Sequence, residues 1–288
     1  MRPLYEMEII QIDVTNACMN SCSNCTRLIG HHHKPFFMDF DIFRNAVDSL
    51  ADFPGIVGMI GGEPLLHPDF EKMADYMARK LPDQKRRGLW SSIPKGSKYG
   101  SLINDVFGTQ YFNDHTTNTI LHQPVLVAAE EIVRDQEEMW ELIEKCWVQN
   151  MWSASITPKG AFFCEVAASF DMLFTGPGGW RVEAGWWKRD VDEFQEQKER
   201  ACPKCGCAIP LERRYSVDNI DDVSSANLEA LRTIRSPGVA NGRVRLYTGG
   251  QVENWNPHSN WYMDQVEGEM EYRKRIADRL NGQPGCRK

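Results

Sequence analysis

Residues 7–25 read MEIIQIDVTNACMNSCSNC, and this stretch decides the fold class. Its first part, 7–14, is short and rich in β-branched side chains, which indicates a buried strand. Cys18, Cys22 and Cys25 follow with the spacing C-x3-C-x2-C. Thiolates are the ligands that iron–sulfur clusters take, and three of them on one short loop can hold three irons of a [4Fe–4S] cluster. The sequence therefore predicts a metal-binding loop directly after a strand.

Alternating strands and helices continue from this loop. The pattern predicts a helix at 40–52, a strand at 56–60, a helix from Pro68, a strand at 88–93, a polar loop at 94–118 and a strand at 123–128. Strands that alternate with helices at this spacing form parallel βα units. A complete eight-unit barrel needs about 250 residues, so this part of the chain has room for only about four or five units. We therefore expect an α/β fold, with a partial (β/α) barrel core over residues 1–134.

The remainder of the chain has a different pattern. The expected elements are a helix from Asp135 with Glu138 as a capping pair, a β-hairpin from WSASI to AFFC, a Gly- and Trp-rich loop at 175–189, a charged helix at 190–200, a helix at 226–235, a strand at 243–248 and a helix at 260–280. We expect a small α+β module over 135–215 and a mostly helical extension over 216–288.

Composition excludes several classes of protein. The chain has 288 residues, with 33 Lys and Arg against 40 Asp and Glu, for a net charge of −7. Nucleic acid and anionic membrane surfaces attract basic proteins, so neither is an expected partner. No apolar stretch approaches the roughly 20 residues that span a bilayer, and the start lacks a secretory signal. Nine cysteines, an odd number, favour metal ligation over disulfides in a cytoplasmic protein.

A second motif, Gly61-Gly62-Glu63-Pro64, follows the strand at 56–60. Glycines at a strand end let backbone atoms approach a ligand closely. Together with C-x3-C-x2-C after the first strand, this motif resembles the radical S-adenosylmethionine (SAM) enzymes. The resemblance implies that Cys18, Cys22 and Cys25 ligate a [4Fe–4S] cluster and that SAM chelates its open iron. It also implies that Gly61, Gly62, Glu63 and Pro64 bind the methionyl amino group of SAM.

Two further positions follow from this resemblance. Ser91 and Ser92, at the end of the strand at 88–93, occupy a region that touches SAM in relatives, although serine at a strand end is also a common turn former. The family often has an aromatic residue just before the third cysteine, where this chain has Asn24. Contacts to the adenine must therefore differ in detail.

Zinc is the alternative metal for the first loop. The nearest residues that would complete a zinc site are His31, His32 and His33. C-x3-C-x2-C is not a usual zinc spacing, and we expect these histidines to form a solvated polar turn.

A second group of cysteines has the spacing C-x17-C-x37-C-x2-C, formed by Cys146, Cys164, Cys202 and Cys205. This spacing resembles the SPASM/twitch subgroup of radical SAM enzymes, and in particular enzymes of the 2-deoxy-scyllo-inosamine dehydrogenase type. The resemblance implies one auxiliary [4Fe–4S] cluster on these four thiols. Read alone, Cys202 to Cys207 also fits half of a zinc ribbon, and Cys146 fits a core thiol. Cys207 is open as an alternative ligand, a hydrogen donor or a bystander, and Cys286 is expected to be a bystander.

The family's chemistry sets the expected function. A 5′-deoxyadenosyl radical abstracts hydrogen from the substrate after an external donor, such as flavodoxin or ferredoxin, reduces the cluster. Oxidation at a carbinol carbon would give a ketone, whereas hydrogen return from Cys207 would give an epimer. The first strand begins near residue 7, which leaves no room for a leader-peptide domain. This favours a small polar substrate, such as a sugar or cyclitol, over a peptide. A zinc-stabilised binding module is the alternative outside the enzyme class.

Overall fold

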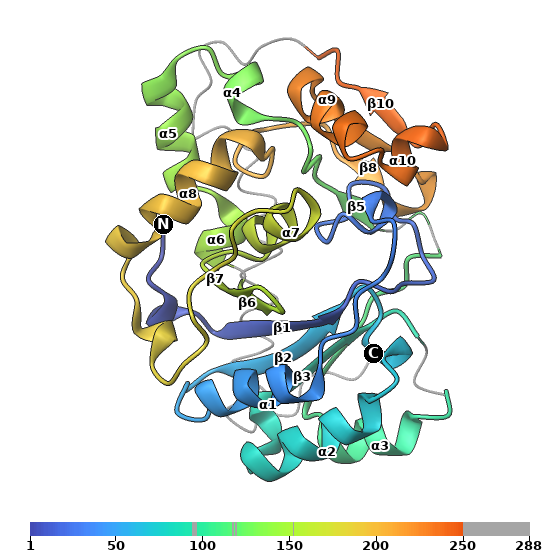
Figure 1. Ribbon diagram of the computed structural model, residues 1–288, viewed down its shortest axis with the longest axis vertical. Coiled ribbons are helices and arrows are strands. Elements are labelled where there is room, and N and C mark those ends of the chain that lie inside the picture. The colour runs from blue at the N-terminus through green and yellow to red at the C-terminus, as the bar shows by residue number, and fades with distance from the viewer. Residues whose placement is uncertain (94–96, 117, 119, 152, 250–288) are drawn as a thin grey trace.

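A six-stranded sheet organises the molecule (Figure 1). The computed structural model describes residues 1–93, 97–116, 118, 120–151 and 153–249, so the predicted helix at 260–280 lies outside the described residues. In sheet order the strands are β4 (Thr109–Phe112), β3 (Arg87–Ser91), β2 (Ile56–Gly61), β1 (Ile9–Thr15), β6 (Ser153–Thr157) and β7 (Gly160–Phe162). All neighbouring strands are parallel except β6 and β7, which form the predicted hairpin. The expected mixed α/β fold with a parallel sheet is therefore present.

Strand β1 is buried along its whole length because both of its faces are covered. Ile10, Ile12 and Val14 belong to the main apolar core. Alternate residues of a strand point to opposite faces, so Gln11 and Asp13 lie on the other face. Both are buried, and a buried polar side chain needs a hydrogen-bond partner. The strand therefore has an apolar face toward the core and a polar face toward the site described below.

Three helices cover one side of the sheet: α1 (Phe40–Ser49), α2 (Phe70–Lys80) and α3 (Gly100–Val106) (Figure 1). Helix α1 begins where the side chain of Asp39 accepts a hydrogen bond from the amide of Asp41. Its buried residues include Phe43, Ala46 and Val47, spaced to form one face, as the sequence predicts. These helices form the outer layer on this side of the sheet.

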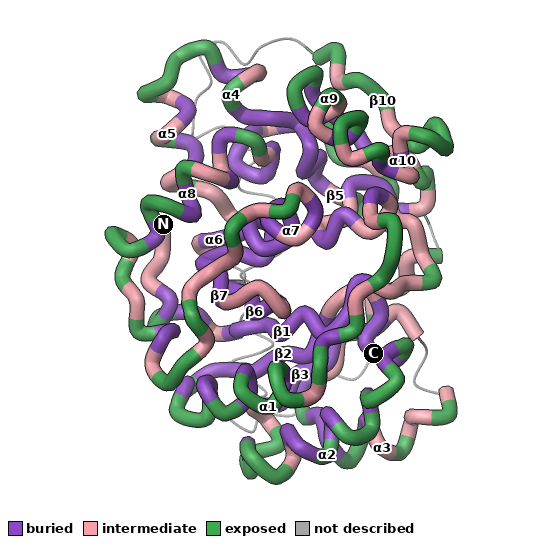
Figure 2. Tube along the Cα trace, in the orientation of Figure 1, coloured by how far each residue is buried: buried purple, intermediate pink, exposed green. Residues whose placement is uncertain are grey.

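The rest of the described chain packs beyond the opposite side of the sheet (Figures 1 and 2). Its helices are α4 (Ala129–Ile132), α5 (Gln136–Glu144), α6 (Trp147–Met151), α7 (Glu165–Leu173), α8 (Gln195–Ala201), α9 (Ser225–Thr233) and α10 (Pro237–Ala240). Two small sheets pair β5 (Leu121–His122) with β8 (Arg214–Tyr215), and β9 (Asp221–Val223) with β10 (Val244–Leu246). In the described ranges, no helix has the length and apolar character required to cross a membrane.

Two secondary-structure predictions were wrong. Strand β4 lies within the stretch predicted as a polar loop, because it is a short edge strand of mixed burial without clear alternation. Residues 123–128, predicted as a strand, make only an isolated bridge at Leu126. Their backbone hydrogen bonds go elsewhere: the Val125 carbonyl accepts from Gly206, and the Leu126 carbonyl accepts from Ser224. The segment is therefore buried without joining a sheet.

Pairing across the predicted domain boundaries links the three parts of the chain. Strand β6 lies beside β1 in the main sheet, although it comes from the 135–215 part. Strand β5, from the first part, pairs with β8 near residue 215. The described portion of the extension contains strands as well as helices. The division at 134 and 215 stays a prediction, since these two pairings cross position 134 and the isolated Leu126–Val223 bridge joins the first part to the third.

Candidate active site

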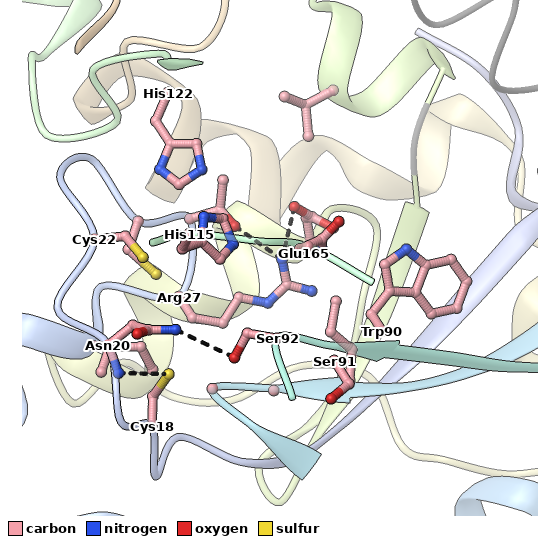
Figure 3. A pocket seen from close by; sticks show the side chains of 18 of the residues that line it. Cys18, Asn20, Cys22, Arg27, Trp90, Ser91, Ser92, His115, His122 and Glu165 are labelled. Atoms are coloured by element: carbon pink, nitrogen blue, oxygen red, sulfur yellow. Dashed lines mark hydrogen bonds and ion pairs between the residues drawn. The ribbon is translucent and has the colours of Figure 1, made fainter. Parts of the chain in front are cut away.

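A cavity of about 310 Å³ lies where the carboxyl ends of the central strands meet (Figure 3). Ligands commonly bind at this end of parallel strands. Its lining comes from four regions that are far apart in the sequence: the cysteine loop, the ends of β2 and β3, the segment near β5, and α6 with α7. The lining residues that matter below are Cys18, Asn20, Cys22, Cys25, Arg27, Gly61, Gly62, Trp90, Ser91, Ser92, His115, His122 and Glu165.

The three predicted ligands Cys18, Cys22 and Cys25 all line this cavity, and each is partly exposed. The backbone amide of Asn20 donates a hydrogen bond to Sγ of Cys18 at 3.4 Å. Burial, together with charge repulsion from Cys25, raises the pKa of the Cys18 thiol to about 11 and that of Cys22 to about 12. The three thiols therefore lie close enough to influence one another's pKa. A metal cation bound among them would favour their ionised forms.

The glycines of the GGEP motif make close contacts with their own chain. A Cβ atom on Gly61 would lie 2.0 Å from the Thr15 carbonyl oxygen, and one on Gly62 would lie 2.4 Å from that of Ala17. The amides of Gly62 and Glu63 donate to these same carbonyls, each at 2.7 Å. Gly61 and Gly62 therefore lie against the backbone of residues 15–17, which leads to Cys18. This packing ties the end of β2 to the start of the cysteine loop. The close approach of these glycines to a ligand stays a prediction.

Glu63 is fully buried, and its carboxylate joins the ends of two strands. Ser91 Oγ donates to one carboxylate oxygen at 2.8 Å, while the amide and the hydroxyl of Ser92 donate to the other at 2.7 and 2.8 Å. The amide of Leu65 also donates to the carboxylate. The side-chain amide of Asn20 then donates to Ser92 Oγ at 3.2 Å. The two serines thus line the cavity and also support Glu63.

Asn24 replaces the aromatic residue of the family motif, and it bonds to the C-terminal extension. It adopts the left-handed conformation, with φ of 50°. Its side-chain oxygen accepts from the amide of Asp222 at 2.9 Å, and its side-chain amide donates to the Asp222 carboxylate at 3.2 Å. Arg214 and Arg245 bind that same carboxylate. The extension therefore holds the cysteine loop, a role that the sequence analysis did not find.

His31 corrects the prediction of a solvated turn. Its side chain is fully buried, with Nδ1 2.7 Å from Ser236 Oγ and Nε2 3.1 Å from the Asp221 carboxylate. Nδ1 is therefore hydrogen-bonded to Ser236, whereas Nε2 faces the Asp221 carboxylate without a hydrogen bond among the described residues, and His31 does not line the cavity at Cys18. Only His33 is exposed, and His32 is partly buried, which lowers its pKa to about 4. Within the described residues, no three His, Cys, Asp or Glu side chains are arranged to hold a single metal ion.

A buried ion pair lies at the cavity wall between the two groups of cysteines. Arg27 and Glu165 are 8% and 4% exposed, and Nη1 of Arg27 lies 2.8 Å from Oε1 of Glu165 (Figure 3). Nε of Arg27 also donates to Asp13 at 3.1 Å. Asp13 and Gln11, the polar face of β1, thus gain their partner from the cysteine loop.

The wall beyond this pair contains neutral polar groups. His122 lies with Nδ1 2.7 Å from the Ser23 carbonyl, and its ring makes an edge contact with that of His115. Burial lowers the pKa of His115 to about 4 and also lowers that of His122. Trp90 is stacked on Tyr111, and its indole nitrogen is buried without a hydrogen-bond partner in the part of the chain that the structure describes. A ligand with hydrogen-bonding groups would suit these walls.

The second group of cysteines also converges. A small cavity of about 20 Å³ is lined by all five: Cys146, Cys164, Cys202, Cys205 and Cys207. Burial, together with charge repulsion from Cys205, raises the pKa of Cys146 to about 12. The pKa values of Cys164 and Cys202 are also raised, first by burial and then by Cys146. The remaining lining is largely apolar, with residues such as Ile143, Phe163 and Ala201.

One prediction about this second group was wrong. The apolar spacing from Asp135 predicts a helix that carries Cys146 on its apolar face, but helix α5 ends at Glu144 and Cys146 lies after it. Cys207 is 2% exposed, and its amide donates to Sγ of Cys205 at 3.4 Å. It faces the other four thiols and is not among the residues that line the cavity at Cys18.

Comparisons with known proteins give little further information. No protein-family model matches the sequence, and no curated protein matches it. The solved structures that resemble the fold include BtrN in complex with AdoMet and 2-DOIA, with a TM-score of 0.45 and 15% identity over 69% of this chain and 92% of that chain. A second is BtrN in an open conformation, with a TM-score of 0.41 and 13% identity over 70% of this chain and 91% of that chain. At these scores the likeness carries no argument about this protein.

Proposed function

We propose that this protein is a radical SAM oxidoreductase with an auxiliary cluster of the twitch type. Cys18, Cys22 and Cys25 would hold a [4Fe–4S] cluster that binds SAM. Cys146, Cys164, Cys202 and Cys205 would hold a second [4Fe–4S] cluster. One observation carries the proposal: three thiols and the strand ends at Gly61 and Ser91 share a single cavity, while a second thiol group lines a neighbouring cavity, with Val148 in the lining of both.

The residues at the first site fit a cluster with one open iron. Three thiols are present on the loop, and His31 is not among the residues that line their cavity. The adjoining cavity offers room for a ligand at the open position. Three protein ligands and one exchangeable position follow the same logic as catalytic metal sites. The amide of Asn20 on Cys18 adds a hydrogen bond of the type that tunes such clusters.

The residues at the second site fit a cluster that is fully ligated by protein. Four thiols satisfy a [4Fe–4S] cluster, and five face this small cavity. The apolar residues around them would keep water away, which influences the reduction potential of such a group.

When bound, the first cluster with SAM would supply radical hydrogen abstraction, and the second would supply a one-electron acceptor, with flavodoxin or ferredoxin as external donor. The chain's own residues would position the reactants. Glu63 would hold the ends of β2 and β3 in place through Ser91 and Ser92. The neutral imidazole of His122, fixed by the Ser23 carbonyl, would present its other nitrogen to a substrate hydroxyl. Trp90 would donate to a substrate or SAM oxygen.

Oxidation is favoured over epimerisation by the place of Cys207. A thiol that returns hydrogen must reach the substrate, and Cys207 lines the second cavity and not the first. We therefore propose a dehydrogenase acting on a small polar substrate such as a sugar or cyclitol. A peptide-modifying enzyme is the alternative within the same family.

Anaerobic reconstitution tests this proposal. We expect about eight irons per chain, because two [4Fe–4S] clusters contain eight, together with a brown chromophore and 5′-deoxyadenosine after addition of SAM and dithionite. Zinc without iron, and no cleavage of SAM, would contradict the proposal and favour a zinc-stabilised binding module. For the reaction type, turnover in deuterated water separates a carbonyl product from deuterium at the reacting carbon.

A further inference from the structure

The Arg27–Glu165 ion pair joins the loop of the first cysteine site to the helix that follows a cysteine of the second. Arg27 is two residues after Cys25, and Glu165 directly follows Cys164 at the first turn of α7. Their charged atoms lie 2.8 Å apart, and both side chains are more than nine-tenths buried. A contact of this kind is short, directional and poorly screened by solvent.

Other contacts hold the pair rigidly from both sides. Arg27 also binds Asp13 on β1, and Asp13 in turn accepts a hydrogen bond from Ser155 on β6. The Arg27 guanidinium therefore lies between two strands of the sheet and α7. Because the strands are paired side by side, this arrangement fixes the position of Glu165 relative to the cysteine loop.

We propose that the Arg27–Glu165 pair couples the two cysteine sites, both by holding them at a fixed separation across the cavity and by placing one shared charge pair between their clusters. This inference rests on the proposed function, because it requires clusters at both sites. Arg27 and Glu165 are thus positioning residues for the two sites. They are distinct from the ligands and from the groups at the ends of β2 and β3.

The position of the pair in the chain places one charge beside each site. Arg27 follows Cys25 by two residues, and Glu165 is next to Cys164. Reduction of a cluster adds negative charge, so removing the charge of Glu165 should favour the reduced form at both sites.

A redox titration of the reconstituted holoenzyme, without substrate or SAM, tests this coupling. We expect two reductive steps in the wild-type protein. Glu165→Gln should shift both midpoint potentials to more positive values. The matched control is Asp171→Asn, which neutralises another buried carboxylate of α7, paired with Lys159 at 2.5 Å and away from the first cavity. The control should leave the first-site potential unchanged.

The outcomes separate this inference from the proposed function. If the wild-type protein shows no reductive step, both fail together. If the wild type shows two steps and Glu165→Gln shifts neither, or only one, the coupling is overturned while the proposed function stands. A first-site shift in Asp171→Asn equal to that in Glu165→Gln would also overturn it.

A second variant keeps the test decisive if Glu165→Gln fails to load iron. Glu165→Asp retains the charge but shortens the side chain by one methylene group. We expect wild-type potentials and a weaker magnetic interaction between the two reduced clusters in electron paramagnetic resonance (EPR) spectra. An unchanged interaction would contradict the mechanical part of the proposal, and shifted potentials would contradict the electrostatic part.

Discussion

The two groups of cysteines differ in ways that predict different tasks. The first has three thiols at the edge of a cavity of about 310 Å³ whose walls are rich in polar groups. The second has five thiols around a cavity of about 20 Å³ with largely apolar walls. A site that exchanges a ligand needs an open position, whereas a resident cluster needs complete ligation. In the proposed function, the first group would be the centre that binds and cleaves SAM, and the second would be the centre that accepts an electron. The number of thiols and the access to them separate the two groups.

Removal of the first group should have the largest effect. Replacement of Cys18, Cys22 and Cys25 by alanine should abolish cleavage of SAM and remove about half of the iron, because the two clusters are expected to load independently. Iron analysis and chromatography of 5′-deoxyadenosine provide the measurements. Unchanged iron in this variant would contradict the assignment of these ligands.

Removal of the second group should produce the complementary result. Cys146→Ala combined with Cys164→Ala should also remove about half of the iron. It should leave dithionite-driven cleavage of SAM intact, since the first cavity keeps its three thiols and both strand ends. If this variant lost SAM cleavage while retaining a folded core by circular dichroism, the proposed division of tasks between the sites would be wrong.

Substitution at Glu63 should have an intermediate effect on the first site alone. Glu63→Gln removes a buried charge that accepts from Ser91, Ser92 and the Leu65 amide. Hydrogen bonds to a charged group contribute about 1.5–3 kcal/mol, so we expect the free energy of unfolding to fall by about 2 kcal/mol. Denaturant titration measures this fall, and calorimetry should show weaker SAM binding.

The exposed Glu71 on α2 provides the matched control for that substitution. Glu71→Gln should change the free energy of unfolding by less than about 0.5 kcal/mol, as surface substitutions usually do. Equal effects at the two positions would show that Glu63 has no special structural role.

Cys207 should give the smallest effect and decides how many thiols the second site uses. Cys207→Ala should leave iron content and SAM cleavage at wild-type values, because four other thiols complete that site. The variant tests whether the fifth thiol is a bystander. A fall in iron content like that expected for the variant that combines Cys146→Ala with Cys164→Ala would instead identify Cys207 as a ligand.

Much of the fold followed from local patterns in the sequence. The spacing of apolar residues predicted α1 and α2, because a helix repeats its buried face with a fixed period. Strands β1 to β3 were predicted from short apolar runs between the helices. The edge strand β4 escaped because it is short and only partly buried. Residues 123–128 have the composition of a strand, yet their hydrogen bonds go to loops and side chains.

In the candidate site, too, some features were predicted from local patterns in the sequence and others were not. The cysteines and the GGEP motif were visible because their spacing along the chain is itself the signal. Asn24 and Asp222 are 198 residues apart, and Arg27 and Glu165 belong to different parts of the fold. Such pairs depend on how the chain returns upon itself, which no local pattern encodes. One signal was available for Gln11 and Asp13: polar residues within an apolar strand require buried partners.

EPR spectroscopy of the first site alone tests the central claim most directly. The Cys146→Ala and Cys164→Ala double variant is reconstituted anaerobically, reduced with dithionite, and measured with and without SAM. We predict a single cluster signal that changes when SAM is added, because SAM would bind the iron that Cys18, Cys22 and Cys25 leave open. A signal unaffected by SAM would contradict the account.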